Sequence, residues 1–545
     1  EAKSLYEAII NKGILEAKVL TNLGTIYQQL KQPRKAIELY KRSISEFPKS
    51  YEAYSNLGKI YINLGQHALA ENYLIKVVTI KPDYLMAYQN LFNLYLNINQ
   101  VEKAENALYK CLQIDPNNIL TLSNLGRFLL EKGKFDKAKQ FIIKAISLKP
   151  DFWIGYNNLA ILEASIGNLT EAEKNFQRVI ELNPKFFEAY VNLGEVKIDL
   201  NKIDEAESLF LKSLEIKKDY SPAYCSLLRL YEKTNNIKKL KQKLDSLRGS
   251  DFIQNELLLY NSRVLFREKR YKKAKELIEK ISLGWLKETD INTRINFWSF
   301  KAFIEEKSNN FDEAYNSFLR SQINPKYEKC DPKIFRNYII NYEKNLQNDD
   351  YFIKRNEFFK EKSKVVFLIG FPRSGTTLLD TILRSHPYVD VIEEKPILNL
   401  LENIIKSQFN CKLAEIYKLN EDEVRILQTN YLHQLTKLSD KKNAQIFIDK
   451  FPFQTVCLPL INFIFPDARI IFAHRHPYDT VLSCFQQAFE PNNAMANLKS
   501  LKESSKIYDL TMNMWVKYKE NLNLDFTISK YESLVDDFEN HTKKI

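Results

Sequence analysis

A period of 34 residues runs through the first half of the chain, and it limits the possible fold more than any other feature. Three positions recur in phase: an Asn that Leu always follows, an Ala 14 residues after it, and a Pro 12 residues further on. These positions are Asn22, Asn56, Asn90, Asn124, Asn158 and Asn192; Ala36, Ala70, Ala104, Ala138, Ala172 and Ala206; and Pro48, Pro82, Pro116, Pro150 and Pro184. A single helix pair cannot bury its own apolar face, so the period predicts helix pairs that stack into a superhelix.

The recurring residues resemble those of the tetratricopeptide repeat. A small residue such as Gly24 or Ala36 lets the two helices of a repeat approach closely, and the Pro ends the second helix before the next repeat begins. Repeat identity gives the fold but not the ligand, so two interpretations stay open. The array is either a groove that binds a peptide or protein partner, or a scaffold that carries a second domain.

The repeat pattern weakens after about Lys218, and we expect a looser helix pair around Ala302 and Ala314 to close the array. We therefore predict a repeat superhelix over residues 1–325 and a connecting helical segment over residues 326–363.

The start of the chain falls inside this pattern. Ala2 lies 34 residues before Ala36, which is the position of a second helix, and the first residue is Glu1 rather than Met. We expect the sequence to be truncated at this end.

The hydrophobic pattern changes character in the last third of the chain. Residues 365–369, 446–448 and 469–473 are continuous β-branched and aromatic runs, which are typical of buried parallel strands. Helical stretches separate them. Strands that alternate with helices predict a second domain over residues 364–545, an α/β domain with a parallel sheet and a P-loop-like arrangement.

Glycine usage locates a candidate site in this domain. Only Gly370 and Gly375 occur after Gly284, and both follow the first predicted strand directly. Glycine is favoured where the backbone must approach another group closely, and a helix that starts near Thr376 would point its free N–H groups at an anion. An ordinary tight turn is the simpler alternative.

The glycine spacing fits a Walker A loop, but the residue types do not. Thr376 stands where that motif needs its Lys, and the positive charge lies inside the loop, at Arg373. A kinase or nucleoside triphosphatase that uses ATP and Mg²⁺ is therefore the weaker alternative.

Several motifs resemble those of sulfotransferases that use 3′-phosphoadenosine 5′-phosphosulfate (PAPS). Residues 372–379, Pro-Arg-Ser-Gly-Thr-Thr-Leu-Leu, resemble the loop that holds the 5′-phosphosulfate, and residues 469–483 resemble the element that holds the 3′-phosphate. Residues 449–453, Asp-Lys-Phe-Pro-Phe, and residues 531–535, Tyr-Glu-Ser-Leu-Val, resemble two further elements of the family. The combination of these motifs with the repeats resembles the bacterial tetratricopeptide sulfotransferases. By this resemblance we expect the sequence to lack part of the family's C-terminal segment, in addition to its truncated N-terminus.

The resemblance implies a role for each matching residue. It implies that Glu394, Lys450 and Arg373 are catalytic. The residues implied to bind the nucleotide are Arg373, Ser374, Gly375, Thr376, Thr377, Arg475, Ser483 and Tyr531. It implies PAPS as co-substrate, with the cation of Lys450 at the bridging oxygen in place of a metal.

The choice of Glu394 as the base rests on a resemblance to tyrosylprotein sulfotransferases. In this chain, as in those enzymes, a His-Pro pair precedes the Glu; here the pair is His386-Pro387. The adjacent Glu393 is an alternative. Because consecutive residues in a strand point in opposite directions, we expect only one of the two carboxylates to face the site. We also expect like-charge repulsion from Glu393 to raise the pKa of Glu394 towards that of a general base.

Composition limits which classes of partner and which cellular compartment we expect. The net charge of +12 favours an anionic ligand, but the basic residues are spread through the repeats without a nucleic-acid-binding motif, so we expect no nucleic-acid partner. Six Cys without CxxC spacing indicate a reducing compartment, and the pair His474 and His476 lacks a third metal ligand. No apolar run is long enough to span a membrane. We predict a cytoplasmic protein without a metal, with a leader lost from the N-terminus as the open alternative.

We therefore expect a sulfotransferase that moves a sulfuryl group from PAPS to an acceptor hydroxyl. A protein tyrosine is the first candidate acceptor, and glycans and small alcohols stay open, because fold and donor do not determine the second substrate. A non-catalytic tetratricopeptide adaptor is the third alternative.

Overall fold

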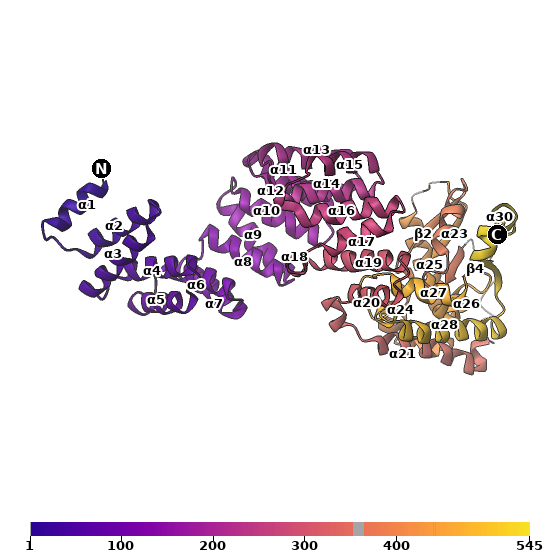
Figure 1. The fold of residues 1–545 in the computed structure, drawn as a ribbon. Helices are drawn as coiled ribbons and strands as arrows, with labels where there is room; N and C mark the ends of the chain where they lie inside the picture. Colours follow the sequence, from indigo (N-terminus) through magenta and orange to yellow (C-terminus); the bar gives the residue numbers. More distant parts are fainter. Residues whose placement is uncertain (1, 353–364, 440, 442) are drawn as a thin grey trace. The chain divides into compact units, whose positions relative to one another are not determined.

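The structure is a computed structural model that describes residues 2–352, 365–439, 441 and 443–545. It divides into two compact units, Glu1–Glu256 and Leu257–Ile545 (Figure 1). The predicted domain boundaries at residues 325 and 363 stay predictions. The last helices before the sheet belong to the same unit as the sheet.

The first unit consists of paired helices, as the 34-residue period predicts (Figure 1). The first helices of the repeats are α2 (Ala17–Gln29), α4 (Tyr51–Asn63), α6 (Leu85–Asn97), α8 (Ile119–Glu131), α10 (Trp153–Ser165), α12 (Phe187–Asp199) and α14 (Ser221–Lys233). The second helices are α1 (Ala2–Asn11), α3 (Pro33–Glu46), α5 (His67–Ile80), α7 (Val101–Ile114), α9 (Phe135–Leu148), α11 (Leu169–Leu182), α13 (Ile203–Ile216) and α15 (Ile237–Ser246).

The recurring small residues lie where the two helices of a repeat touch. A Cβ atom built on Gly194 would lie 2.4 Å from Cε1 of Phe210 in the paired helix, so a larger residue would push the helices apart. Ala36 and its equivalents from Ala70 to Ala206 are completely buried. Helix α3 ends at Glu46, two residues before Pro48. The roles predicted for the Gly, Ala and Pro positions are confirmed.

Helices also fill the described residues between the repeats and the sheet. They are η1 (Asp251–Ile253), α16 (Gln254–Arg267), α17 (Tyr271–Glu279), α18 (Leu283–Glu288), α19 (Ile291–Lys307), α20 (Phe311–Ser321), η2 (Pro325–Lys329), α21 (Pro332–Glu343) and η3 (Lys344–Gln347). Helices α19 and α20 are the looser pair expected around Ala302 and Ala314, and both alanines are buried. Of the predicted connecting segment, residues 353–363 lie outside the described residues.

The second unit contains a five-stranded, wholly parallel sheet in the order β2-β3-β1-β4-β5. Its strands are β1 (Val365–Gly370), β2 (Val389–Glu393), β3 (Ile446–Lys450), β4 (Arg469–His474) and β5 (Asp525–Lys530). β1, β3 and β4 are the three predicted strands, and they form the centre of the sheet. The hydrophobic pattern did not reveal β5, an edge strand with four of its six residues exposed.

Both faces of this sheet are covered, because successive strand residues point to opposite sides. Phe367 and Phe472 pack on one side, and Leu368 and Ile471 pack on the other. The first face carries α21, α24 (Ile397–Ser407), α25 (Glu421–Leu438), α26 (Leu458–Ile464) and α28 (Leu501–Asn521). The second face carries α23 (Thr376–Arg384) and α29 (Tyr531–Asp536). The predicted fold class, a helical repeat array followed by an α/β domain, is confirmed.

The strand order places a topological switch at β1, which lies between β3 and β4. Open parallel sheets bind ligands beyond the carboxyl ends of their strands, at the point where the strand order reverses. The loop after β1 lies at that point.

Candidate functional site

The loop between β1 and α23 depends on its two glycines. Gly375 has a φ of 100°, and a Cβ atom on it would lie 2.7 Å from Cδ2 of Tyr531. A Cβ atom on Gly370 would lie 2.5 Å from the carbonyl oxygen of Ala473. The close backbone approach that the glycine usage predicted is therefore present, and it joins the loop to the ends of β4 and β5.

The two predicted phosphate elements meet at this loop. Nε of Arg373 donates a hydrogen bond to Oγ of Ser483, which lies on α27 (Pro477–Gln486), at 3.1 Å. Arg475 donates from Nη1 to the carbonyl oxygen of Arg373 at 3.4 Å. The guanidinium carbon of Arg475 lies 4.8 Å from the ring centroid of Tyr531. Four of the predicted nucleotide-binding residues, from three separate segments, are therefore connected by a continuous series of contacts.

Two buried polar atoms in this cluster have no hydrogen-bond partner within the described part of the chain. They are Oγ of Ser374 and Nε of Arg475. Buried polar atoms are normally hydrogen-bonded, so two unpaired ones beside a second guanidinium indicate room for a polar ligand. The hydroxyls of Thr376 and Thr377 stand at the positive N-terminal end of α23. This set of donors fits a ligand that carries phosphate groups.

Two carboxylates and a lysine lie at the ends of β2 and β3. Nζ of Lys450 donates to Oε1 of Glu394 at 2.8 Å and to Oε1 of Glu393 at 2.9 Å. The Lys450 side chain is 1% exposed, and the two carboxylates are about half exposed. Burial lowers the pKa of Lys450, but the hydrogen bonds to Glu394 and Glu393 outweigh this effect and raise it above its usual value. The hydrogen bond from Lys450 lowers the pKa of Glu393.

Both carboxylates therefore contact the same cation, whereas only Glu394 is among the residues that line the cavity described below. Strand alternation does not apply, because β2 ends at Glu393 and Glu394 has a φ of 48°. The N–H of Glu394 donates to the carbonyl oxygen of Lys450 at 2.8 Å, which holds this turn against β3.

A cavity of about 600 Å³ connects these groups. The predicted residues that line it are Arg373, Gly375, Thr376, Thr377, Glu394, Arg475 and Tyr531. Ser374, Ser483 and Lys450 lie behind this lining. Ser374 belongs to the loop itself. Ser483 and Lys450 form hydrogen bonds with Arg373 and Glu394, which line the cavity.

Part of the cavity wall comes from residues outside the sequence motifs. Gln487, Phe489, Glu490, Asn492 and Met495 line it from the segment that follows α27. This segment has little regular structure and no recognisable motif.

The residue that follows α20 holds this part of the cavity wall in place. Nε2 of Gln322 donates to the carbonyl oxygens of Phe485 at 2.9 Å and Gln487 at 3.2 Å. The C-terminal end of α20 thus braces the segment beside the cavity.

Asp449 precedes Lys450 on β3 but points to the face of the sheet that α25 covers. Its Oδ2 accepts hydrogen bonds from Tyr431 at 2.6 Å and from Gln454 at 3.1 Å, and its side chain is buried. Burial raises the pKa of Asp449 to about 6. It supports the strand that carries Lys450 and does not line the cavity.

The described residues contain no group of three or more His, Cys, Asp or Glu placed to hold a metal ion. None of their helices combines the length and the apolar character needed to cross a membrane.

Comparisons with known proteins match both parts of the chain. Residues 365–545 match the model of the sulfotransferase family, and residues 27–91, 99–159 and 166–231 match a tetratricopeptide repeat model. An uncharacterized protein of Aquifex aeolicus (strain VF5) is 32% identical over 131 residues, which are 23% of this chain. The matched stretch spans only 17% of that protein's length.

Solved structures resemble the helical part. A tetratricopeptide repeat protein from Parabacteroides merdae ATCC 43184 is 20% identical, with a TM-score of 0.36, over 43% of this chain and 91% of its own. PilF of Pseudomonas aeruginosa is also 20% identical, with a TM-score of 0.33, over 37% of this chain and 95% of its own. The chain thus carries tetratricopeptide repeats in its N-terminal part, and its residues 365–545 are a domain of the sulfotransferase family.

Proposed function

We propose that this chain is a sulfotransferase that uses PAPS to sulfate an acceptor hydroxyl, with a tyrosine of a polypeptide as the acceptor. The repeats would bind the acceptor or a partner protein. The observation that carries the proposal is that the two predicted phosphate-binding elements contact each other at a cavity that also contains the Glu394 carboxylate. Arg373, Ser483 and Arg475 are linked by hydrogen bonds, and the cavity that Arg373 and Arg475 line also contains Glu394.

The cluster of donors would hold the two ends of the nucleotide separately. Thr376 and Thr377 lie at the start of α23, where the helix dipole favours an anion, and Arg373 lies in the loop just before it. These three residues would hold the 5′ side. Arg475 and Ser483 would hold the 3′-phosphate, and Tyr531 would border the nucleotide. PAPS supplies an activated sulfuryl group at its 5′-phosphate.

Glu394 would accept the proton of the acceptor hydroxyl. Its carboxylate lines the cavity and is about half exposed, so an acceptor can reach it. As the proton leaves, the acceptor oxygen forms a bond to sulfur while the bond from sulfur to the bridging oxygen breaks. Lys450 would offset the negative charge that grows on the departing phosphate, as fixed charges do in phosphoryl transfer.

The test separates donor binding from turnover. Calorimetry with adenosine 3′,5′-bisphosphate should show binding that does not depend on Mg²⁺ and that ATP does not match. Labelled PAPS and a tyrosine peptide should then give a peptide heavier by the mass of one sulfuryl group in mass spectrometry, and the same peptide with Phe for Tyr should not. Absence of bisphosphate binding, or Mg²⁺-dependent binding of ATP alone, would contradict the proposal.

A further inference from the structure

A second pocket adjoins the candidate donor cavity. It has a volume of about 320 Å³ and shares Phe451, Phe453, Asn492 and Met495 with the cavity that contains Glu394. Its exposed lining is mostly apolar, with Leu398 of α24 among the contributors. A group in this pocket would therefore lie next to the cavity that contains Glu394, and outside the predicted phosphate-binding loop.

Helix α21 forms one side of this pocket. It contributes Ile334, Phe335 and Tyr338. This helix spans Pro332–Glu343 and so precedes the matched sulfotransferase domain, which begins at residue 365. The wall is thus an addition from outside the matched domain.

Buried polar contacts hold α21 in this position. The hydroxyl of Tyr338 donates a hydrogen bond to Oε1 of Glu402 and lies 3.0 Å from Sγ of Cys457. The hydroxyl of Tyr342 donates to the same oxygen of Glu402 at 2.7 Å. Glu402 is 4% exposed, and such an ionisable group is stable inside a protein only with hydrogen-bond partners. The helix therefore has a defined orientation towards the pocket.

Aromatic contacts connect α21 to the phosphate-binding loop. The ring of Phe335 lies 4.9 Å from that of Phe453, and Phe453 lies 5.3 Å from Phe371. Phe371 directly follows Gly370 in the loop after β1. Packed aromatic rings thus connect α21 to the predicted phosphate-binding loop.

We propose that α21 is one wall of the acceptor site, and that Phe335 packs against a flat apolar group that bears the acceptor hydroxyl. This inference rests on the proposed function. Aromatic rings pack favourably against one another in offset or edge-to-face geometry, so a phenol ring suits this lining better than a sugar, whose hydroxyls would lose their water here.

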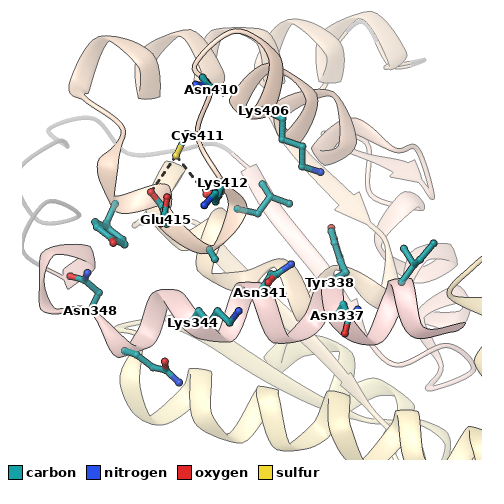
Figure 2. Close-up of a pocket in the computed structure, with 15 residues that line it drawn as sticks. Asn337, Tyr338, Asn341, Lys344, Asn348, Lys406, Asn410, Cys411, Lys412 and Glu415 are labelled. Carbon is teal, nitrogen blue, oxygen red and sulfur yellow. Dashed lines mark hydrogen bonds between the residues drawn. The ribbon is translucent and has the colours of Figure 1, made fainter. Parts of the chain in front are cut away.

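A larger hollow lies along the same helix (Figure 2). It has a volume of about 1020 Å³, and Ile334 and Tyr338 line both it and the apolar pocket. Its lining is rich in amide and amino groups, including Asn337, Asn341 and Lys344 of this segment (Figure 2). An acceptor with an aromatic group in the apolar pocket would continue into a polar hollow. A polypeptide has this combination of groups.

The experiment uses p-cresol, which carries the ring and hydroxyl of tyrosine, and the full chain saturated with adenosine 3′,5′-bisphosphate. NMR titration should detect p-cresol binding to the unmodified protein. Phe335→Ala should weaken it about tenfold, the effect of losing one buried aromatic contact. Phe335→Leu, which keeps an apolar side chain and spares the fold, should weaken it less. The affinity for the bisphosphate should stay the same in both variants.

Ile340→Ala is the matched control, since Ile340 is an exposed residue of α21 that lines neither hollow. Equal p-cresol binding by Phe335→Ala and Ile340→Ala would overturn the inference, as would absence of p-cresol binding by the loaded, unmodified protein. Failure of the proposed function would appear separately, as absence of bisphosphate binding in the unmodified protein.

Discussion

Arg373 and Ser483 are 110 residues apart in the chain, and Nε of the arginine donates a hydrogen bond to Oγ of the serine at 3.1 Å. Each belongs to a different one of the two predicted phosphate-binding motifs. The contact joins the loop after β1 to helix α27. The adjacent contact between Arg475 and the carbonyl oxygen of Arg373 fixes the second guanidinium at the same place.

Arg475→Ala should weaken the binding of adenosine 3′,5′-bisphosphate about 10- to 100-fold, because a charge-assisted hydrogen bond contributes roughly 1.5–3 kcal/mol. The affinity for adenosine 5′-monophosphate, which lacks the 3′-phosphate, should change little. Calorimetry with both nucleotides measures the difference. Arg469→Ala is the control, because this exposed arginine lies at the other end of β4. Equal losses for both nucleotides would assign Arg475 a different role.

Glu394→Gln should lower kcat about 10²- to 10⁴-fold, the range for loss of a general base. Glu393→Gln is its matched control, since the two carboxylates lie at nearly equal distances from Lys450. Only Glu394 lines the donor cavity, so Glu393→Gln should retain most of the activity. Steady-state kinetics with saturating PAPS provides the measurement, and a larger loss in Glu393→Gln would make Glu393 the base.

Gly375→Ala should abolish most nucleotide binding. The new Cβ would meet Tyr531 at 2.7 Å, in a backbone conformation with a φ of 100°. Gly65→Ala is the control for backbone strain alone, because Gly65 also has a positive φ, of 70°, but nothing lies within 4 Å of its Cβ position. Binding of the bisphosphate by both variants, checked by circular dichroism for folding, separates the two effects. Unchanged binding in Gly375→Ala would mean that the contact with Tyr531 is not needed.

Asp449 should make the stability of the sheet depend on pH. Its pKa is about 6 in the folded protein and 3.8 ordinarily, so the folded state favours the proton. The stability that the protonated Asp449 side chain contributes is fully present below pH 3.8 and is lost as the pH rises through 6. Relative to the unmodified protein, Asp449→Asn should therefore gain stability between pH 4 and pH 7, by up to about 3 kcal/mol.

Amide exchange of β3, measured for both proteins at each pH, tests this expectation. Asp525→Asn, at an exposed position on β5, should show no such trend. A pH-independent difference between Asp449→Asn and the unmodified protein would contradict the assignment.

Much of the fold could be predicted because its signals are local. The contact of Gly194 with Phe210 requires a small residue at that position, and the close approach of Tyr531 to the loop after β1 requires Gly375. Each requirement is therefore visible in the sequence. The central strands are buried on both faces, and this makes them continuously apolar. Edge strand β5 is largely exposed and carries no such signal.

The linear chain already determines the helix pairs, the central strands and the residue types of the phosphate-binding elements, because backbone conformation and burial constrain each short segment directly. The three-dimensional packing alone brings Glu393 and Glu394 to the same lysine and places Phe335 of α21 beside Phe453. These arrangements depend on where a turn leaves a strand and on contacts between segments more than 50 residues apart. Such contacts arise from the fit of many side chains together, and no single segment records them.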